Sequence, residues 1–185
     1  MCHTDRFFAA NRAWAWRLVE ADPRAFERMA AGQAPEVLMV PSDLNALSVL
    51  QYAVEVLMVP HIVVCGHYGC GGVQASLAAP GHGAVARWLR RLRQVRRLHR
   101  AELAKLRGAA RERRLVELNV IEQVRNVARS AVVRDAWEAG ARTTVHGWVY
   151  DVSDGLLTPL CRQSHGGASL EIAPDGTTAS CSSAT

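Results

Sequence analysis

An apolar run that leads into a glycine-rich turn constrains this chain more than any other feature. Residues His61–Cys65 read His-Ile-Val-Val-Cys and predict a buried strand, and Gly66–Gly72 follow directly as Gly-His-Tyr-Gly-Cys-Gly-Gly. Ligands of open α/β sheets bind where such strands end. A histidine and a cysteine three residues apart can point at one cation, and zinc prefers imidazole nitrogen and thiolate ligands. The turn therefore predicts two zinc ligands, His67 and Cys70.

Length and composition indicate one globular domain. The chain has 185 residues, of which 49% are hydrophobic and 21% charged, and no apolar stretch is as long as a membrane span. The N-terminal residues lack a charged region followed by an apolar one, so we expect a cytoplasmic protein. In a reducing compartment, an odd number of scattered cysteines favours thiols or metal ligands over disulfides. They are Cys2, Cys65, Cys70, Cys161 and Cys181.

The order of the predicted elements indicates an α/β fold. Residues 1–33 form a helical arm, in which Asp22-Pro23 opens the second helix. Val37–Val40 is a short buried strand, and a helix capped by Ser42 or Asp43 connects it to the strand that starts at His61. Strand, helix and strand with short links predict a parallel β-α-β unit, with strands covered on both faces. We therefore expect a mainly parallel sheet flanked by helices in three layers.

The C-terminal half adds a long helical region and a hairpin. The helical region runs from about Glu112 to Glu138, and Thr143–Tyr150 is the next strand. A turn at 151–155 leads to its hairpin partner at Leu156-Leu157. The remainder is rich in glycine, serine and threonine, so we expect one domain over 1–160 and a flexible tail over 161–185.

Residues 87–114 carry 12 lysines and arginines but two acidic residues, Glu102 and Glu112. Such a concentration of positive charge raises the possibility of nucleic-acid binding. Apolar residues recur through the same stretch at helical spacing, however, which is typical of an amphipathic helix with a solvated arginine-rich face. We favour the amphipathic helix and rank nucleic-acid binding last. The apolar positions are Val85, Leu89, Leu92, Val95, Leu103 and Leu106.

Several blocks in the same order are similar to those of the β-class carbonic anhydrases, over nearly everything up to about Leu160. The turn at Cys65–Gly72 is moderately specific by itself, and all the blocks in register make the resemblance strong. The blocks are Asn11–Ala15, Asp43–Val54, Cys65–Gly72, Leu115–Val124, His146–Asp151 and Asp154–Leu157.

The resemblance implies a zinc lyase that interconverts carbon dioxide and bicarbonate. Members of the family hold one zinc per subunit with two cysteines and one histidine, and water or hydroxide takes the fourth position. Zinc lowers the pKa of that water toward neutrality. The match makes His67 and Cys70 ligands. It also implies a homodimer or larger homo-oligomer, with the N-terminal helices packed on a partner. Because no apolar stretch is as long as a membrane span, we expect no membrane association.

The chain departs from the family at the third ligand. In the family, the first strand leads to a Cys-x-Asp-x-Arg motif, which supplies the second cysteine and an Asp–Arg pair. Here Val37–Val40 runs straight into Pro41-Ser42-Asp43-Leu44-Asn45. The intervening segment is missing, so we expect a sheet one strand smaller than the family's. In a second alignment Asp43 takes the place of the catalytic aspartate, with Pro41 and Asn45 in place of the cysteine and arginine.

Two functional hypotheses follow from that departure. One is a carbonic anhydrase with impaired catalysis, and the other is an inactive relative that acts as a scaffold. We expect Cys65 to pack in the core, and His61 and His146 to be packing or hydrogen-bonded histidines. Other donors that could complete a zinc site are Cys2, His3, Asp43, Cys161 and Cys181.

Overall fold

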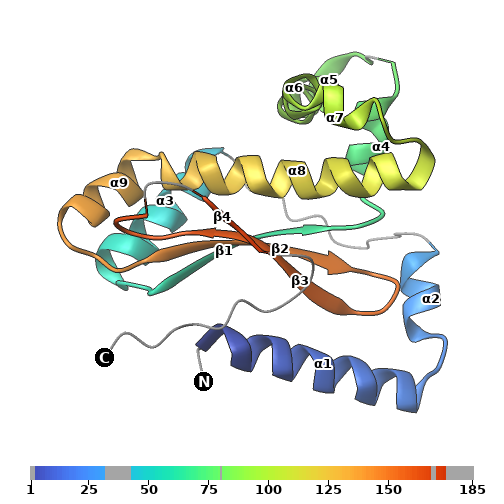
Figure 1. The fold of residues 1–185 in the computed structure, drawn as a ribbon, viewed down its shortest axis with the longest axis horizontal. Coiled ribbons are helices and arrows are strands. Elements are labelled where there is room, and N and C mark those ends of the chain that lie inside the picture. The colour runs from blue at the N-terminus through green and yellow to red at the C-terminus, as the bar shows by residue number, and fades with distance from the viewer. Residues whose placement is uncertain (1–2, 32–42, 80, 168–169, 174–185) are drawn as a thin grey trace.

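The computed structural model describes residues 3–31, 43–79, 81–167 and 170–173. Its described strands form one sheet in the order β1-β2-β3-β4. The long helix α8 (Gly108–Ala128) covers one face of the sheet, and α1 (His3–Ala21) lies along the other (Figure 1). The predicted α/β class, the layered arrangement and the N-terminal helix are therefore confirmed.

The described sheet is mixed. Strands β1 (His61–His67) and β2 (Thr144–Asp151) pair in parallel, and β3 (Leu156–Gln163) pairs antiparallel with β2 as the predicted hairpin. Strand β4 (Glu171–Ile172) pairs antiparallel with β3. Parallel pairing is confined to β1 and β2 among these four strands, so the described sheet is mixed and not mainly parallel as predicted. The strand expected at Val37–Val40 lies outside the described residues.

The boundary predicted at residue 160 falls inside β3. Cys161 is 4% exposed and packs in the core, and Arg162 pairs with Glu171 across the two strands. The prediction relied on the loss of apolar residues after Cys161. Two antiparallel strands can nevertheless be held by their backbone hydrogen bonds, which leave no apolar pattern in the sequence.

The N-terminal arm packs on its own sheet. Asn11 in α1 donates through Nδ2 to the carbonyl of Gly155 (2.9 Å) and accepts a bond from the Leu157 backbone N–H (2.9 Å). The ring of Phe8 lies 4.8 Å from that of Trp148, centroid to centroid. Asp22 accepts a bond from the N–H of Arg24, close to the start of α2 (Ala25–Ala30). Helix α2 nevertheless begins only at Ala25, with Arg24 at the capping position and no side-chain cap, so it starts two residues later than Asp22-Pro23 predicted.

Helix α3 precedes β1, and the helices α4 to α9 lie between β1 and β2 in the chain, with α5 to α7 on the side of α8 that faces away from the sheet (Figure 1). The helix α3 (Asp43–Gln51) continues as a π-helical turn at Tyr52–Val56. The connection from β1 to β2 contains α4 (Gly71–Leu77), α5 (Gly83–Trp88), α6 (Arg90–Leu98), α7 (Arg100–Leu103), α8 and α9 (Ala131–Glu138). The basic stretch 87–114 is therefore divided among the end of α5, the short helices α6 and α7, and the start of α8. The single helical region expected up to Glu138 is divided into two helices, α8 and α9. Ser130 separates them, because its side chain caps α9 by accepting a bond from the Val133 N–H at 3.4 Å.

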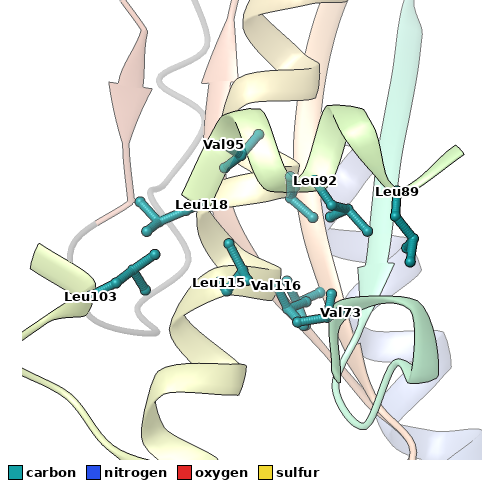
Figure 2. Packing of buried hydrophobic residues seen from close by; sticks show 10 residues of the cluster. Val73, Leu89, Leu92, Val95, Leu103, Leu115, Val116 and Leu118 are labelled. Carbon is teal, nitrogen blue, oxygen red and sulfur yellow. The ribbon is translucent and has the colours of Figure 1, made fainter. Parts of the chain in front are cut away.

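Helix α8 is the centre of the core. Figure 2 shows its side chains Leu115, Val116 and Leu118 meeting Leu92, Val95 and Leu103 from the basic segment. Its other side packs against the sheet at Gly66 and Gly147, where a methyl group would lie 2.6 Å from Val120 and 2.9 Å from Val124, respectively. These two glycines allow α8 to approach β1 and β2 closely. The turn after β1 is thus anchored beside α8.

Candidate metal centre

His67 is the last residue of β1, and one of its ring nitrogens is fixed by the backbone. Its Nδ1 lies 3.1 Å from the carbonyl oxygen of Tyr68. Because a carbonyl oxygen can only accept, this contact assigns the proton to Nδ1 and leaves a lone pair on Nε2. A histidine that binds a metal through Nε2 carries its proton on Nδ1, and backbone carbonyls commonly fix this tautomer. His67 is therefore prepared to bind a cation through Nε2.

Cys70 lies at the position that precedes α4 and is partly buried. The indole of Trp88 covers the neighbouring Gly72, because a methyl group built there would meet the ring at 2.6 and 2.9 Å. The same position lies 3.7 Å from the sulfur of Cys70. The thiol therefore sits beside a tryptophan ring, on the side of the turn that faces α5.

The turn opens on two different clefts. His67 lines a cleft together with Tyr68, Arg113 and Asp151. Cys70 lines another, whose walls come from α5, α6 and α8 and include Arg87, Trp88, Arg90, Arg91, Asn119 and Gln123. Across the described ranges, no three or more His, Cys, Asp and Glu side chains are placed so that they could hold one metal ion. His67 and Cys70 suit zinc chemically, but the described residues do not complete a zinc site.

Tyr68 is the best-anchored side chain of the turn. Its hydroxyl donates to Glu117 Oε1 (2.8 Å), and the Arg113 guanidinium lies 3.6 Å above its ring. Burial and the Glu117 carboxylate raise the pKa of Tyr68 to about 12, so the phenol stays a donor at neutral pH. Arg113 also binds Asp151 Oδ2 at 2.9 Å. Burial opposes ionisation of Asp151, but the bonds from Ser153 and Arg113 hold its pKa below the usual value.

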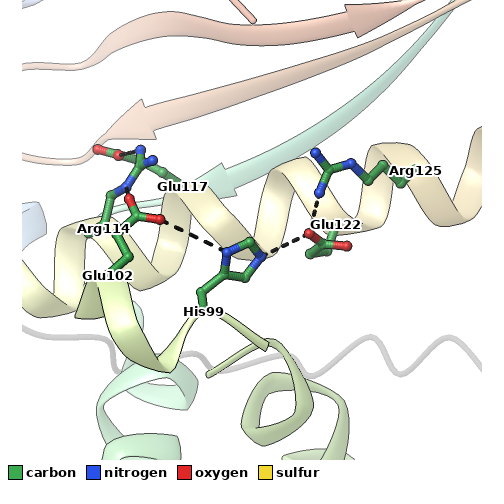
Figure 3. A network of polar contacts seen from close by, with 6 residues as sticks. All are labelled: His99, Glu102, Arg114, Glu117, Glu122 and Arg125. Atoms are coloured by element: carbon green, nitrogen blue, oxygen red, sulfur yellow. Dashed lines mark hydrogen bonds and ion pairs between the residues drawn. The ribbon is translucent and has the colours of Figure 1, made fainter. Parts of the chain in front are cut away.

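A network of alternating charges joins the basic segment to α8 (Figure 3). Arg114 binds both Glu102 (2.6 Å) and Glu117 (2.7 Å). His99 lies between Glu102 and Glu122, with Nε2 2.9 Å from Glu122 Oε1, and Arg125 also contacts Glu122. Glu117 is therefore shared between Tyr68 and Arg114. The network holds the turn, α7 and α8 together without any metal ion.

A sequence model of the family described as carbonic anhydrase matches residues 27–157. This chain belongs to the carbonic anhydrase family. A carbonic anhydrase of Emericella nidulans is 43% identical to it, with 84% of this chain and 82% of the relative covered. Among solved structures, the β-carbonic anhydrase of Coccomyxa in complex with acetazolamide is 33% identical, covers 89% of each chain and has a TM-score of 0.64.

A second similar structure is that of a carbonic anhydrase described as a tetramer. It is one of two tetrameric β-carbonic anhydrases from Sordaria macrospora, and it is 29% identical with a TM-score of 0.59. The alignment covers 86% of this chain and 98% of that one. The fold and the β class of the carbonic anhydrase family, both expected from the sequence blocks, are thus confirmed.

Among the other donors weighed from the sequence, Cys161 is the one whose side chain is described, and it does not lie at the turn. Asp43 begins α3, but its side chain lies outside the described residues, as do those of Cys2, His3 and Cys181. Cys161 lies in the core, where burial raises its pKa to about 11. The histidines of β1 and β2 bind each other, His61 Nδ1 being 3.1 Å from His146 Nε2, as expected for hydrogen-bonded histidines.

The expectation for Cys65 was wrong, because this residue is exposed. Alternate residues of a strand share one face, so Cys65 lies on the side of β1 that carries Val63 and His67. Sequence reasoning also missed Tyr68, Arg113 and Trp88 at this centre. Tyr68 stood inside the quoted turn, whereas the two others come from distant helices and gave no local signal.

Proposed function

We propose that this chain is a carbonic anhydrase with an incomplete zinc site and an impaired capacity to hydrate carbon dioxide. His67 and Cys70 are two of its zinc ligands. The observation that carries the proposal is the tautomer of His67, whose Nε2 lone pair is available at the end of β1, three residues before the partly buried thiol of Cys70. When bound, zinc supplies a water of lowered pKa for attack on the carbon.

The chain's own residues hold the turn in place. Tyr68 fixes the His67 ring through its carbonyl and binds Glu117 through its hydroxyl. Arg113 packs on the Tyr68 ring and pairs with Asp151, so these charges are already balanced inside the His67 cleft. Such contacts orient a metal ligand before the metal arrives.

Impairment rests on what the sequence lacks. No Cys-x-Asp-x-Arg motif occurs in the 185 residues. The alignment with the Emericella relative runs over 188 residues, which exceeds the length of this chain although 84% of it is covered. The relative therefore has residues with no counterpart here, in keeping with a missing segment. A catalytic zinc ordinarily has three protein ligands, so two give weak binding and slow turnover.

The test measures bound zinc and the rate of carbon dioxide hydration on purified, size-fractionated protein. We expect clearly less than one zinc per chain, further loss in His67→Ala and in Cys70→Ser, and hydration far slower than in the Emericella relative. Matched controls are His82→Ala, in an exposed loop, and Cys65→Ser, on the exposed face of β1. Equal zinc loss in these controls would overturn the ligand assignment.

Two other results are informative. One zinc per chain together with a rate equal to that of the relative would contradict the incomplete site and require a substitute ligand. A folded protein without zinc and without catalysis would favour the inactive scaffold instead. We also propose a homo-oligomer, because Trp16 and Phe7 on α1 are 77% and 59% exposed and the Sordaria relative is tetrameric. Light scattering after gel filtration measures the oligomer size.

Bicarbonate and carbon dioxide are the substrates that this proposal implies. None of the described helices is long and apolar enough to cross a membrane. The cytoplasmic location stays a prediction.

A further inference from the structure

The exposed surface of α5–α7 and the loop after α7 carries positive charge without partners. We call this surface the basic face and define it by Arg87, Arg90, Arg97, Arg100, Lys105 and Arg107. All six side chains are exposed, and none of them pairs with a carboxylate in the described part of the chain. On α8, by contrast, Arg113, Arg114 and Arg125 each bind a carboxylate. These three arginines of α8 are thus neutralised, whereas the six cations of the basic face have no carboxylate partner among the described residues.

A buried arginine adds to the positive electrostatic potential of the basic face. Arg93 in α6 is 9% exposed, and its one hydrogen bond goes to the carbonyl of Ala86 at 3.4 Å. Its Nε atom is buried and has no hydrogen-bond partner among the described residues. Burying an unpaired charge is costly. The segment thus keeps a buried, unpaired arginine beside six exposed cations. Its positive electrostatic potential is suited to binding a polyanion.

An exposed indole lies within this charge. Trp88 is 64% exposed, and it lines a cleft together with Arg87, Arg90 and Asn119. One edge of its ring covers Gly72, which fixes the ring in place. Base stacking on aromatic side chains binds single strands without regard to sequence, and arginine forks match phosphate oxygens in pairs. The cleft thus offers a stacking platform with phosphate-binding groups beside it.

We propose that the basic face binds single-stranded nucleic acid, with the arginines on phosphates and one base stacked on Trp88. The choice of anion follows from the residue types, since five of the six cations are arginine. A membrane surface fits less well, because α5, α6 and α7 have 6, 9 and 4 residues and turn between them. An interfacial helix buries its apolar face in the membrane, whereas the apolar residues of α6 are already packed against α8.

This proposal departs from the sequence analysis, which ranked nucleic-acid binding last. Leu89, Leu92 and Val95 are buried against α8, as the amphipathic pattern required. The pattern could not tell whether the arginines opposite them were paired. It also could not show that Trp88 points outward beside them.

The experiment measures the fluorescence anisotropy of a labelled 20-nucleotide oligouridylate with the full chain, from about 50 to 200 mM salt. Each phosphate contact on a single strand contributes about 0.7 to the slope of log affinity against log salt. We expect Arg87→Ala with Arg90→Ala to lower that slope by about 1.4. The matched control replaces two exposed arginines of α1, Arg12→Ala with Arg17→Ala, and should leave the slope unchanged.

Stacking is tested separately at Trp88. Trp88→Ala should weaken binding about tenfold, and Trp88→Phe should retain most of the affinity because a ring remains. Circular dichroism checks whether each variant is folded. If Trp88→Ala is unfolded, the affinity of Trp88→Phe and the salt slope of the double arginine variant test the proposal instead. Absence of binding at 50 mM salt, or an equal loss in the α1 control, would overturn the proposal. So would equal displacement by polyglutamate or by anionic lipid vesicles at matched charge, which would assign the face to acidic proteins or membranes.

Discussion

Acid should destabilise this protein through one histidine in the sheet. His146 is 7% exposed and sits between His61 and Trp148 on the face of the sheet that α1 covers. Burial, followed by the neighbouring His61 and Arg162, lowers the pKa of His146 from 6.5 to about 4. The folded protein therefore keeps this imidazole neutral at a pH where the unfolded chain protonates it.

The sign and size of the effect follow from proton binding. Between pH 6.5 and about 4 the unfolded chain binds one more proton at His146 than the folded chain, so the free energy of unfolding falls as the pH falls. Each unit of pKa difference corresponds to about 1.4 kcal/mol, which gives about 3 kcal/mol once the pH is below 4. Between pH 7 and pH 5 the loss amounts to about 2 kcal/mol.

The assay is urea unfolding of the native sequence and of His146→Gln at pH 7, 6 and 5. Glutamine keeps an amide that can bond to the His61 ring but does not titrate, so the variant should lose about 2 kcal/mol less between pH 7 and pH 5. His82→Gln removes an exposed histidine and should retain the full pH dependence. Identical pH dependence in the native sequence and in His146→Gln would refute the reasoning, because His146 would then be protonated equally in both states.

Three substitutions test the packing by urea unfolding. Gly147→Ala would place a methyl group 2.7 Å from the Cys161 sulfur and should cost about 1–3 kcal/mol, whereas no loss would show that α8 can move away. Gly155→Ala meets both the ring of Phe26 and a φ of +73°, so we expect a loss of at least about 1 kcal/mol and a displaced α2. Leu115→Ala truncates a fully buried side chain and should cost about 2–5 kcal/mol, and a smaller loss would mean that the core collapses around it.

Much of the fold could be predicted where one pattern determined one element. The apolar run at 61–65 became β1, and Leu156-Leu157 paired with β2 as the turn residues indicated. Helix breaks were less visible, because apolar spacing continues across them. Ser130 was a readable cap signal that the long periodic stretch concealed. Strand β4 could not be found, since its pairing with β3 comes from backbone bonds.

The candidate site was predicted in composition and not in geometry. The spacing and residue types of the turn indicate His67 and Cys70 as zinc ligands, and this assignment stays a prediction. That these donors face separate clefts depends on Trp88 and Arg113, which reach the turn from α5 and α8. Local sequence cannot contain that information. The position of Cys65 was in fact readable, because residues two apart on a strand share a face.

Anchoring of the turn makes the zinc measurement interpretable. Many small zinc sites supply the folding energy of their surroundings, so that loss of metal unfolds the protein. Here the turn is attached to α8 through Tyr68 and Glu117, and Gly66 packs against Val120. Glu117 is held in turn by Arg114. None of these contacts uses a metal ion, so a protein that lacks zinc should still fold, and an empty site in folded protein then reports the missing ligand itself.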